Sequence, residues 1–559
     1  MSTSTLSLGS LPGDYRFQAD FVVDASWRLQ AMQDMHSASP SRGCFHYAYW
    51  RDKTSEFPDA RFQEAGATLG LLSLPFFDDA RTQGRLDAAD VLYAHFAAAI
   101  DNLGRQQYAE GTFDEWYKGE RGFAATEFTT IAYGLAARCL GDRLATAERR
   151  RLSEILGRAA GWLARRADRI KANHHAAAAA ALALAADVTG DSAFTAAAHR
   201  KVDEVLERQH SEGWFPEVGG MDLGYCSVLL DYLMIYTRVT GDERAVPATR
   251  RLMSFMFPLL QPDGAILAEM GICLNPYVSR LGMGLLSVFD DRASALANHF
   301  RSHSPRHDGL RPYLADDLRL ARWSHLPLAT ALMCDTFRMS ADAAPLSQAF
   351  PQGWTWWNAA AVGAYHRGDT HVYVSGAGGG QVRVFHGEAF FGDDHGVAIT
   401  GANVTGAGYD PQRPIECRPD GVMLSCDLGT PQFMQPGFVP RLLLRLGSTT
   451  RLGSRLTRAA VDYVRVKRRT AANQSAAPMS SGPAAYRLTR LVTADGSTVQ
   501  IDDRVTAVSG TLSPERVVTL GAVGAADASV EALSPGEVAL RKTWRRDAVP
   551  PKEFRIGAS

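Results

Sequence analysis

The sequence lacks the features that mark several specialised protein classes. Its seven cysteines are scattered and form no CxxC pair, which argues against a disulfide scaffold and a thiolate zinc site. The 59 basic and 60 acidic side chains leave a net charge of -1, so no overall field favours nucleic acid or an anionic membrane. No basic segment followed by an apolar core stands at the N-terminus, and the richest apolar stretch, AAAAAALALAADV, is too short to cross a membrane. We therefore predict a cytoplasmic protein with reduced thiols that neither inserts into a membrane nor binds nucleic acid.

The first part of the chain has the periodicity of helices. With 559 residues, 46% of them hydrophobic and 21% charged, the chain is globular and long enough for two or three domains. From about residue 25 to 340, apolar residues recur at three- and four-residue spacing, and short turns such as TGDSA and TGDER separate the segments. Helices are predicted over 87–104, 123–142, 146–168, 174–191, 192–210, 223–242 and 244–260. Consecutive helical hairpins of similar length indicate an incomplete α/α toroid.

The last part of the chain has the alternation of strands. After about residue 350, segments such as THVYVSGAG, AVDYVRVKRR and YRLTRLVTA alternate with period two and are rich in Val, Thr and Tyr. We predict a multidomain α + β protein, with an α/α toroid over 1–345 and an antiparallel β-sandwich or sheet domain over 346–559. The basic run over 441–469 is interpreted as solvent-facing strands or as a surface for a polyanion. The sequence leaves the oligomeric state open.

Two segments at predicted helix starts combine groups that can exchange protons. Asn173, His174 and His175 precede six alanines. Asn173 is a plausible N-cap, whereas the imidazoles at the start of a narrow helix can point into a cavity. The segment EGWFPEVGGMDLGY supplies Trp214 and Glu217 and brings Tyr225 to the next helix start.

Further polar and aromatic side chains lie in loops that precede other predicted helices. The segment EWYKGER contains two aromatic rings that can stack on a sugar and two charged groups that can bind hydroxyls or a carboxylate. These are Trp116, Tyr117, Glu120 and Arg121, and Arg280 lies in a later loop of the same kind. In a toroid the loops before successive inner helices meet at one mouth, so these residues predict a groove suited to oligosaccharides.

The order of the domains and these segments resemble the heparinase II/III-type and alginate-lyase-like polysaccharide lyases. Asn173 and His174 resemble the Asn-His pair that those enzymes place in the toroid, and Tyr225 resembles their catalytic tyrosine. The resemblance implies β-elimination on a uronate of an acidic polysaccharide or oligosaccharide, without a cofactor. Asn173 then neutralises the uronate carboxylate, His174 or Tyr225 removes the C5 proton, and Tyr225 protonates the leaving oxygen. We expect the three side chains to reach one cavity that is open to solvent.

The β domain offers a weaker set of candidates. Members of this family add a histidine or tyrosine from the sheet domain, for which His395 is our candidate and His386 an alternative. With Asp393 and Asp394 these histidines form a possible but non-diagnostic set of ligands for a structural metal, and no metal is predicted.

Two other functions compete with elimination. A glycoside hydrolase on the same toroid needs two carboxylates that face each other across the groove, for which Glu217 can be paired with Asp222, Glu120 or Glu269. A non-catalytic polysaccharide-binding or assembly protein requires no convergence of Asn173, His174 and Tyr225.

Overall fold

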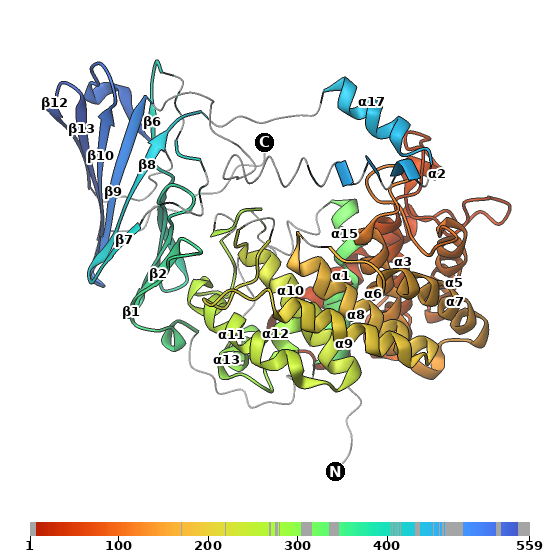
Figure 1. Cartoon of the computed structure of the whole chain (residues 1–559). Helices are drawn as coiled ribbons and strands as arrows, with labels where there is room; N and C mark the ends of the chain where they lie inside the picture. The colour runs from red at the N-terminus through yellow and green to blue at the C-terminus, as the bar shows by residue number, and fades with distance from the viewer. Residues whose placement is uncertain are drawn as a thin grey trace, which may run out of the picture.

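The structure is a computed structural model of the chain. It describes residues 7–545 apart from 169, 218–219, 268–269, 274, 276–277, 279, 303–315, 335–345, 403, 405, 409, 411–412, 414, 431–436, 451, 455, 458, 461–462, 464–484 and 521–526. Figure 1 shows the helical first half of the chain beside a sheet region built from the second half.

Within this described part, six helices with largely buried surfaces form the inner ring. They are α3 (Glu64–Leu72), α6 (Phe123–Leu140), α8 (Ala172–Thr189), α10 (Leu223–Thr240), α12 (Leu281–Leu286) and α16 (His325–Met333). Each packs against the next, and α16 returns to α3, so their contacts run through a complete cycle. The alanines of α8 let its neighbours approach closely, because a small side chain adds little thickness to the helix.

Helices with one polar face cover this ring. They are α1 (Gly13–Met32), α5 (Ala89–Gln106), α7 (Thr146–Leu163), α9 (Ser192–Leu206), α11 (Val246–Met256) and α13 (Asp291–Ser302). Shorter helices are α2 (Tyr47–Trp50), α4 (Asp78–Thr82) and α15 (Asp317–Trp323). The predicted helices agree with these bounds to within a few residues, because apolar residues on one stripe have a single way to be buried. No described helix combines the length and the hydropathy of a membrane span.

The strands form two large antiparallel sheets. The first has the order β1-β2-β3-β4-β5 and the second β12-β13-β10-β9-β8-β7, while β11 pairs with β6. The strands are β1 (Gly353–Trp357), β2 (Val362–Arg367), β3 (Thr370–Ser375), β4 (Gln381–His386), β5 (Ala389–Asp394), β6 (Val397–Ile399), β7 (Ile415–Arg418), β8 (Gly421–Leu428), β9 (Tyr486–Ala494), β10 (Thr498–Ala507), β11 (Val517–Thr519), β12 (Asp527–Ser534) and β13 (Glu537–Arg545). The predicted antiparallel β region is confirmed.

The first sheet is the middle layer between the toroid and the second sheet. Val372 and Val374 of β3 pack with residues of the second sheet, whereas the alternate residue Tyr373 belongs to the core of the toroid. The hydroxyl of Tyr373 donates to the carbonyl of Leu260 at 2.7 Å, and His366 lies 2.8 Å from the carbonyl oxygen of Pro258. This junction makes the β layer part of the same packed structure as the helices.

One predicted strand region is helical instead. α17 (Phe438–Gly447) occupies the start of the basic run, and the described residues Ala459, Ala460 and Tyr463 are also helical. The expectation of solvent-facing strands is therefore wrong for the described part of this run, whereas residues 464–469 lie outside the described residues. Leu442 and Leu446 lie four residues apart, which is the spacing of one helix face.

Candidate functional site

The starts of α8 and α10 adjoin each other at one end of the toroid. The two helices pack side by side, and Lys171, just before α8, forms a β-bridge with Glu217 in the loop that leads to α10. The N–H of Ala172 donates to the carbonyl of Pro216 at 3.3 Å. The loop before α10 therefore lies against the start of α8, which brings Asn173, His174 and Tyr225 to the same end of neighbouring helices.

The capping of α8 differs from our prediction. Lys171, and not Asn173, is the N-cap residue, and Asn173 lies inside the helix. Glu217 provides an acceptor for the free N–H of Asn173, and burial raises the pKa of this carboxyl group to about 8. Glu217 is thus largely protonated at neutral pH. Because its side chain is only 2% exposed, it supports the helix start and does not face an open groove.

Asn173 has an unusual buried amide. Its side chain is 1% exposed, and neither its oxygen nor its nitrogen has a hydrogen-bond partner. Leaving a buried amide unpaired costs about 1–3 kcal/mol in proteins, so such groups are rare in structural positions. The unused Nδ2 donor of this amide is the group that a ligand carboxylate needs, and the unused Oδ1 can accept from a hydroxyl.

His174 lies between a carboxylate and an ammonium group. Its Nδ1 is 2.7 Å from Oε1 of Glu127, a fully buried residue of α6, and its Nε2 is 3.4 Å from Nζ of Lys171. A carboxylate beside Nδ1 favours the tautomer with its proton there, which leaves the Nε2 lone pair on the side of Lys171. Glu127 is a functional candidate that our sequence reasoning missed. Its signal was the single charged residue of the segment FAATEFTTIAYG.

Tyr225 lies in the first turn of α10 and is partly exposed. The N-cap of this helix is Asp222, whose carboxylate accepts the N–H of Tyr225 at 2.9 Å and that of Cys273 at 2.8 Å. Burial raises the pKa of Asp222 to about 6. Asp222 therefore fixes the backbone that carries Tyr225. Of the pairs considered for hydrolysis, Glu217 and Asp222 are both buried as structural supports, and Glu269 lies outside the described residues.

The loop over 108–122 presents Trp116 at the surface. Glu120 accepts the N–H groups of Glu115 at 2.9 Å and Trp116 at 2.8 Å, so its carboxylate holds its own loop together. Arg121 has a positive φ of 53° and pairs with Glu110, and its guanidinium lies 3.9 Å from the ring centroid of Tyr108. These contacts fix a loop in which Trp116 is 67% exposed. Tyr117 is partly exposed beside it.

A chain of charged and aromatic contacts leads from Trp116 to His174. Arg322 lies 5.7 Å from the Trp116 ring and contacts Glu115 at 3.1 Å, and Glu115 is 3.9 Å from Arg61. The Arg61 guanidinium lies 4.2 Å from the Phe128 ring, which in turn is 5.3 Å from the ring of His174. Arg61 and Arg322 were missed because they come from sequence segments that only the closed ring brings together.

Comparison with solved structures identifies the fold. No family model and no curated protein matches the sequence. Chondroitin AC lyase from Streptomyces coelicolor A3, in complex with chondroitin sulphate, aligns with a TM-score of 0.53 and 10% identity over 95% of this chain and 77% of that chain. The chain has the chondroitin AC lyase fold. A tyrosine-to-alanine mutant of the same lyase gives a TM-score of 0.52, 10% identity and coverage of 94% and 76%. Heparinase III is more distant, with a TM-score of 0.42, 9% identity and coverage of 84% and 72%.

Four other residues that we predicted for the site have partners that lie outside the start of α8. His175 lies 2.5 Å from Glu204 of α9, and Trp214 donates to Glu212 at 2.9 Å and stacks on His210. The Arg280 guanidinium donates to Asp14 of α1 at 2.8 Å and is 4% exposed, which contradicts our expectation that it lines the groove. His395 lies 2.9 Å from Asp393, within the β domain.

Asp394, one of the possible metal ligands of the β domain, forms buried ion pairs instead. Asp394 contacts Arg490 at 2.7 Å and pairs with Lys542, and all three side chains are buried. Its carboxylate therefore has two cations already. Across the described ranges, no group of three or more His, Cys, Asp or Glu side chains has an arrangement suited to a metal ion.

Proposed function

We propose that this protein is a polysaccharide lyase that cleaves a uronate-containing polysaccharide or oligosaccharide by β-elimination. The observation that carries the proposal is the unpartnered amide of Asn173 next to the His174–Glu127 pair, at the helix start that adjoins Tyr225. The chondroitin AC lyase fold supports it, because the solved lyase is in complex with an acidic polysaccharide, chondroitin sulphate.

The three side chains have complementary roles in this reaction. The Asn173 amide hydrogen-bonds the uronate carboxylate and stabilises the charge that develops when the adjacent C5 proton leaves. His174, through Nε2, or Tyr225 removes that proton, and Tyr225 donates a proton to the leaving oxygen. Lys171 beside His174 adds positive charge where the enolate forms. The C4–O bond breaks as the C4–C5 double bond forms, so neither water nor a cofactor is consumed.

Substrate access requires a change at the start of α8. Asn173 is 1% exposed and His174 7% exposed, so the expectation that all three side chains are open to solvent is wrong for these two. The segment Trp214–Glu217 lies against the start of α8, since it contacts Lys171 and Ala172. We propose that saccharide binding displaces side chains of this segment and that the stacking surface of Trp116 and Tyr117 holds the adjoining sugars.

An ultraviolet assay tests the proposal. Elimination creates an unsaturated uronate that absorbs at roughly 235 nm, whereas hydrolysis gives saturated products and binding alone gives none. The protein is incubated with a panel of uronate polymers beside the variants Asn173→Ala and Tyr225→Phe. We expect at least a hundredfold loss of rate in both. Tyr236→Phe, near the other end of α10, is the matched control and keeps the activity. New reducing ends without the absorbance would establish the hydrolase instead.

We also propose that the protein works in the cytoplasm. All seven cysteines are free thiols, and Cys44, Cys226, Cys334 and Cys426 are buried. Proteins of oxidising compartments commonly use their cysteines in disulfides, so unpaired buried thiols support a reducing environment. Fractionation of the native host with an antibody against the protein tests this location.

A further inference from the structure

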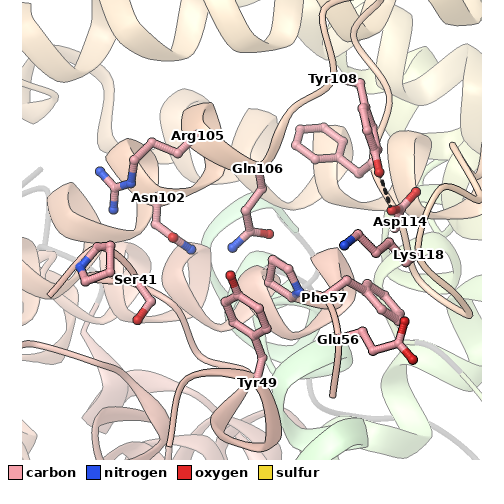
Figure 2. A pocket seen from close by; sticks show the side chains of 13 residues that line it. Ser41, Tyr49, Glu56, Phe57, Asn102, Arg105, Gln106, Tyr108, Asp114 and Lys118 are labelled. Carbon is pink, nitrogen blue, oxygen red and sulfur yellow. Dashed lines mark hydrogen bonds between the residues drawn. The ribbon is translucent and has the colours of Figure 1, made fainter. Parts of the chain in front are cut away.

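A cavity lies outside the candidate active site. Its volume is about 300 Å³, which is at the small end for a ligand pocket and suits one or two sugar rings. Three parts of the chain line it: the segment over 40–58, the end of α5 and the loop over 108–118 (Figure 2). Asn173, His174 and Tyr225 are not among its lining residues.

The cavity has an apolar part and a polar part. Pro40, Phe57, Pro58 and the ring of Tyr49 supply flat apolar surface, which stacks well on the C–H face of a sugar. Asn102, Gln106 and Lys118 supply amides and an ammonium group. Flat rings combined with a few hydrogen-bonding groups are typical of carbohydrate sites, whereas a purely apolar ligand would leave these polar groups unpaired.

Two polar groups of this cavity are unused. The Gln106 Oε1 atom is buried and has no hydrogen-bond partner, and its side chain points into the cavity (Figure 2). The Lys118 ammonium points to the same space and takes part in none of the ion pairs of the described residues (Figure 2). The two carboxylates differ, because Asp114 accepts from Tyr108 at 2.6 Å and Gly119 at 2.7 Å, and Glu56 pairs with Arg445 at 3.0 Å. The unpaired charge of the cavity is therefore positive.

We propose that this cavity binds an acidic sugar unit of the same polymer that the active site cleaves. Lys118 would pair with the carboxylate or sulfate, Gln106 would accept from a hydroxyl, and Tyr49 would stack on the ring. The inference rests on the proposed function for the identity of the polymer. The geometry supports it, because Lys118 and the exposed Trp116 lie two residues apart in one hydrogen-bonded loop, at most about 7 Å along the backbone. An oligosaccharide on Trp116 can thus extend into the cavity.

Chain-length dependence tests the proposal. The variants Tyr49→Ala and Lys118→Gln are compared with Lys53→Gln, because Lys53 is an exposed lysine of the segment over 40–58 that does not itself line the cavity. In the elimination assay, both cavity variants should raise KM at least fivefold more for long acidic oligosaccharides than for the shortest cleavable one. Equal changes for all lengths would overturn the proposal.

A direct binding measurement tests the cavity site independently of the proposed elimination reaction. Calorimetry with the Tyr225→Phe protein measures binding of a chondroitin sulphate hexasaccharide and of neutral maltohexaose. We expect the acidic hexasaccharide to bind and Lys118→Gln to weaken it at least fivefold, whereas Lys53→Gln leaves the affinity as it is. If the protein eliminates no uronate but shows this Lys118-dependent binding, the proposed function fails and the cavity site stands. Binding that is absent, or equal in wild type and Lys118→Gln, removes the cavity site.

Discussion

Replacing Glu217 by glutamine should stabilise the protein, and the gain should grow with pH. Burial raises the pKa of Glu217 to about 8 in the folded chain, from an ordinary value of 4.5. Between these two pH values the unfolded chain has already lost the proton that the folded chain keeps. The unfolded state therefore binds fewer protons, and the free energy of unfolding falls as pH rises through this window. Glutamine has the shape of the protonated side chain and never ionises, so the variant escapes this loss.

The size of the effect follows from the same shift. At 1.36 kcal/mol per pKa unit, the wild type loses about 3 kcal/mol at pH 7 but less than about 1 kcal/mol at pH 5. For a cooperative unit of roughly 300 residues, the difference of about 2.5 kcal/mol corresponds to a Tm change of about 4 °C. Burial also raises the pKa of Asp222. This group titrates in both proteins, so its contribution to the Tm difference largely cancels.

Differential scanning calorimetry from pH 5 to pH 9 measures this effect. The Tm of Glu217→Gln minus that of the wild type should increase from pH 5 to pH 8 and then level off. Glu154→Gln, an exposed glutamate of α7, is the matched control and should show a constant difference. A Tm difference for Glu217→Gln that does not change with pH would refute our reasoning, since it would mean that this carboxyl group ionises as easily in the folded chain as in water.

Three further substitutions test the supports around the site. Glu127→Gln removes the carboxylate beside His174, so kcat should fall roughly 10- to 100-fold and the acidic limb of the kcat/KM profile should move to lower pH, measured by ultraviolet absorbance. An unmoved limb would exclude His174 as the base. Asp222→Ala removes the acceptor of the Tyr225 and Cys273 N–H groups, so it should lower the free energy of unfolding by about 2–4 kcal/mol, measured by urea denaturation. Asp222→Ser should restore part of this loss. Wild-type stability would show that the cap is dispensable. Glu212 accepts two N–H groups of the turn after β1, at 2.8 and 3.1 Å, so Glu212→Ala should lower the calorimetric Tm. An unchanged Tm would mean that the helix–sheet junction does not depend on it.

The secondary structure was largely predictable because periodicity is a local property. The helix predicted over 174–191 is observed as Ala172–Thr189, and the Asp222 carboxylate caps the helix that carries Tyr225. The failure at α17 is also local. The strand prediction rested on the Val- and Tyr-containing residues that follow this segment, whereas Leu442 and Leu446 have the four-residue spacing of a helix.

The candidate site was predictable only in part. Asn173, His174 and Tyr225 lie at adjoining helix starts, as the toroid requires, but the burial of Asn173 and His174 could not be foreseen. The loop that packs against the start of α8 comes after a whole further helix, and Arg280 pairs with Asp14 of the first long helix of the chain. Neither partner can be read from the residues near it.

The sequence by itself determined which segments become helices and strands, where α10 begins, and which amide, imidazole and phenol stand at helix starts. Those properties depend on side-chain spacing and on hydrogen bonds within a few residues. The tertiary structure alone decided that Glu127 faces His174, that Arg61 and Arg322 join Trp116 to that pair, and that Lys118 points into a separate cavity. These contacts arise because closing a ring of helices brings distant segments together, and burial then assigns a partner to each charge that it removes from water.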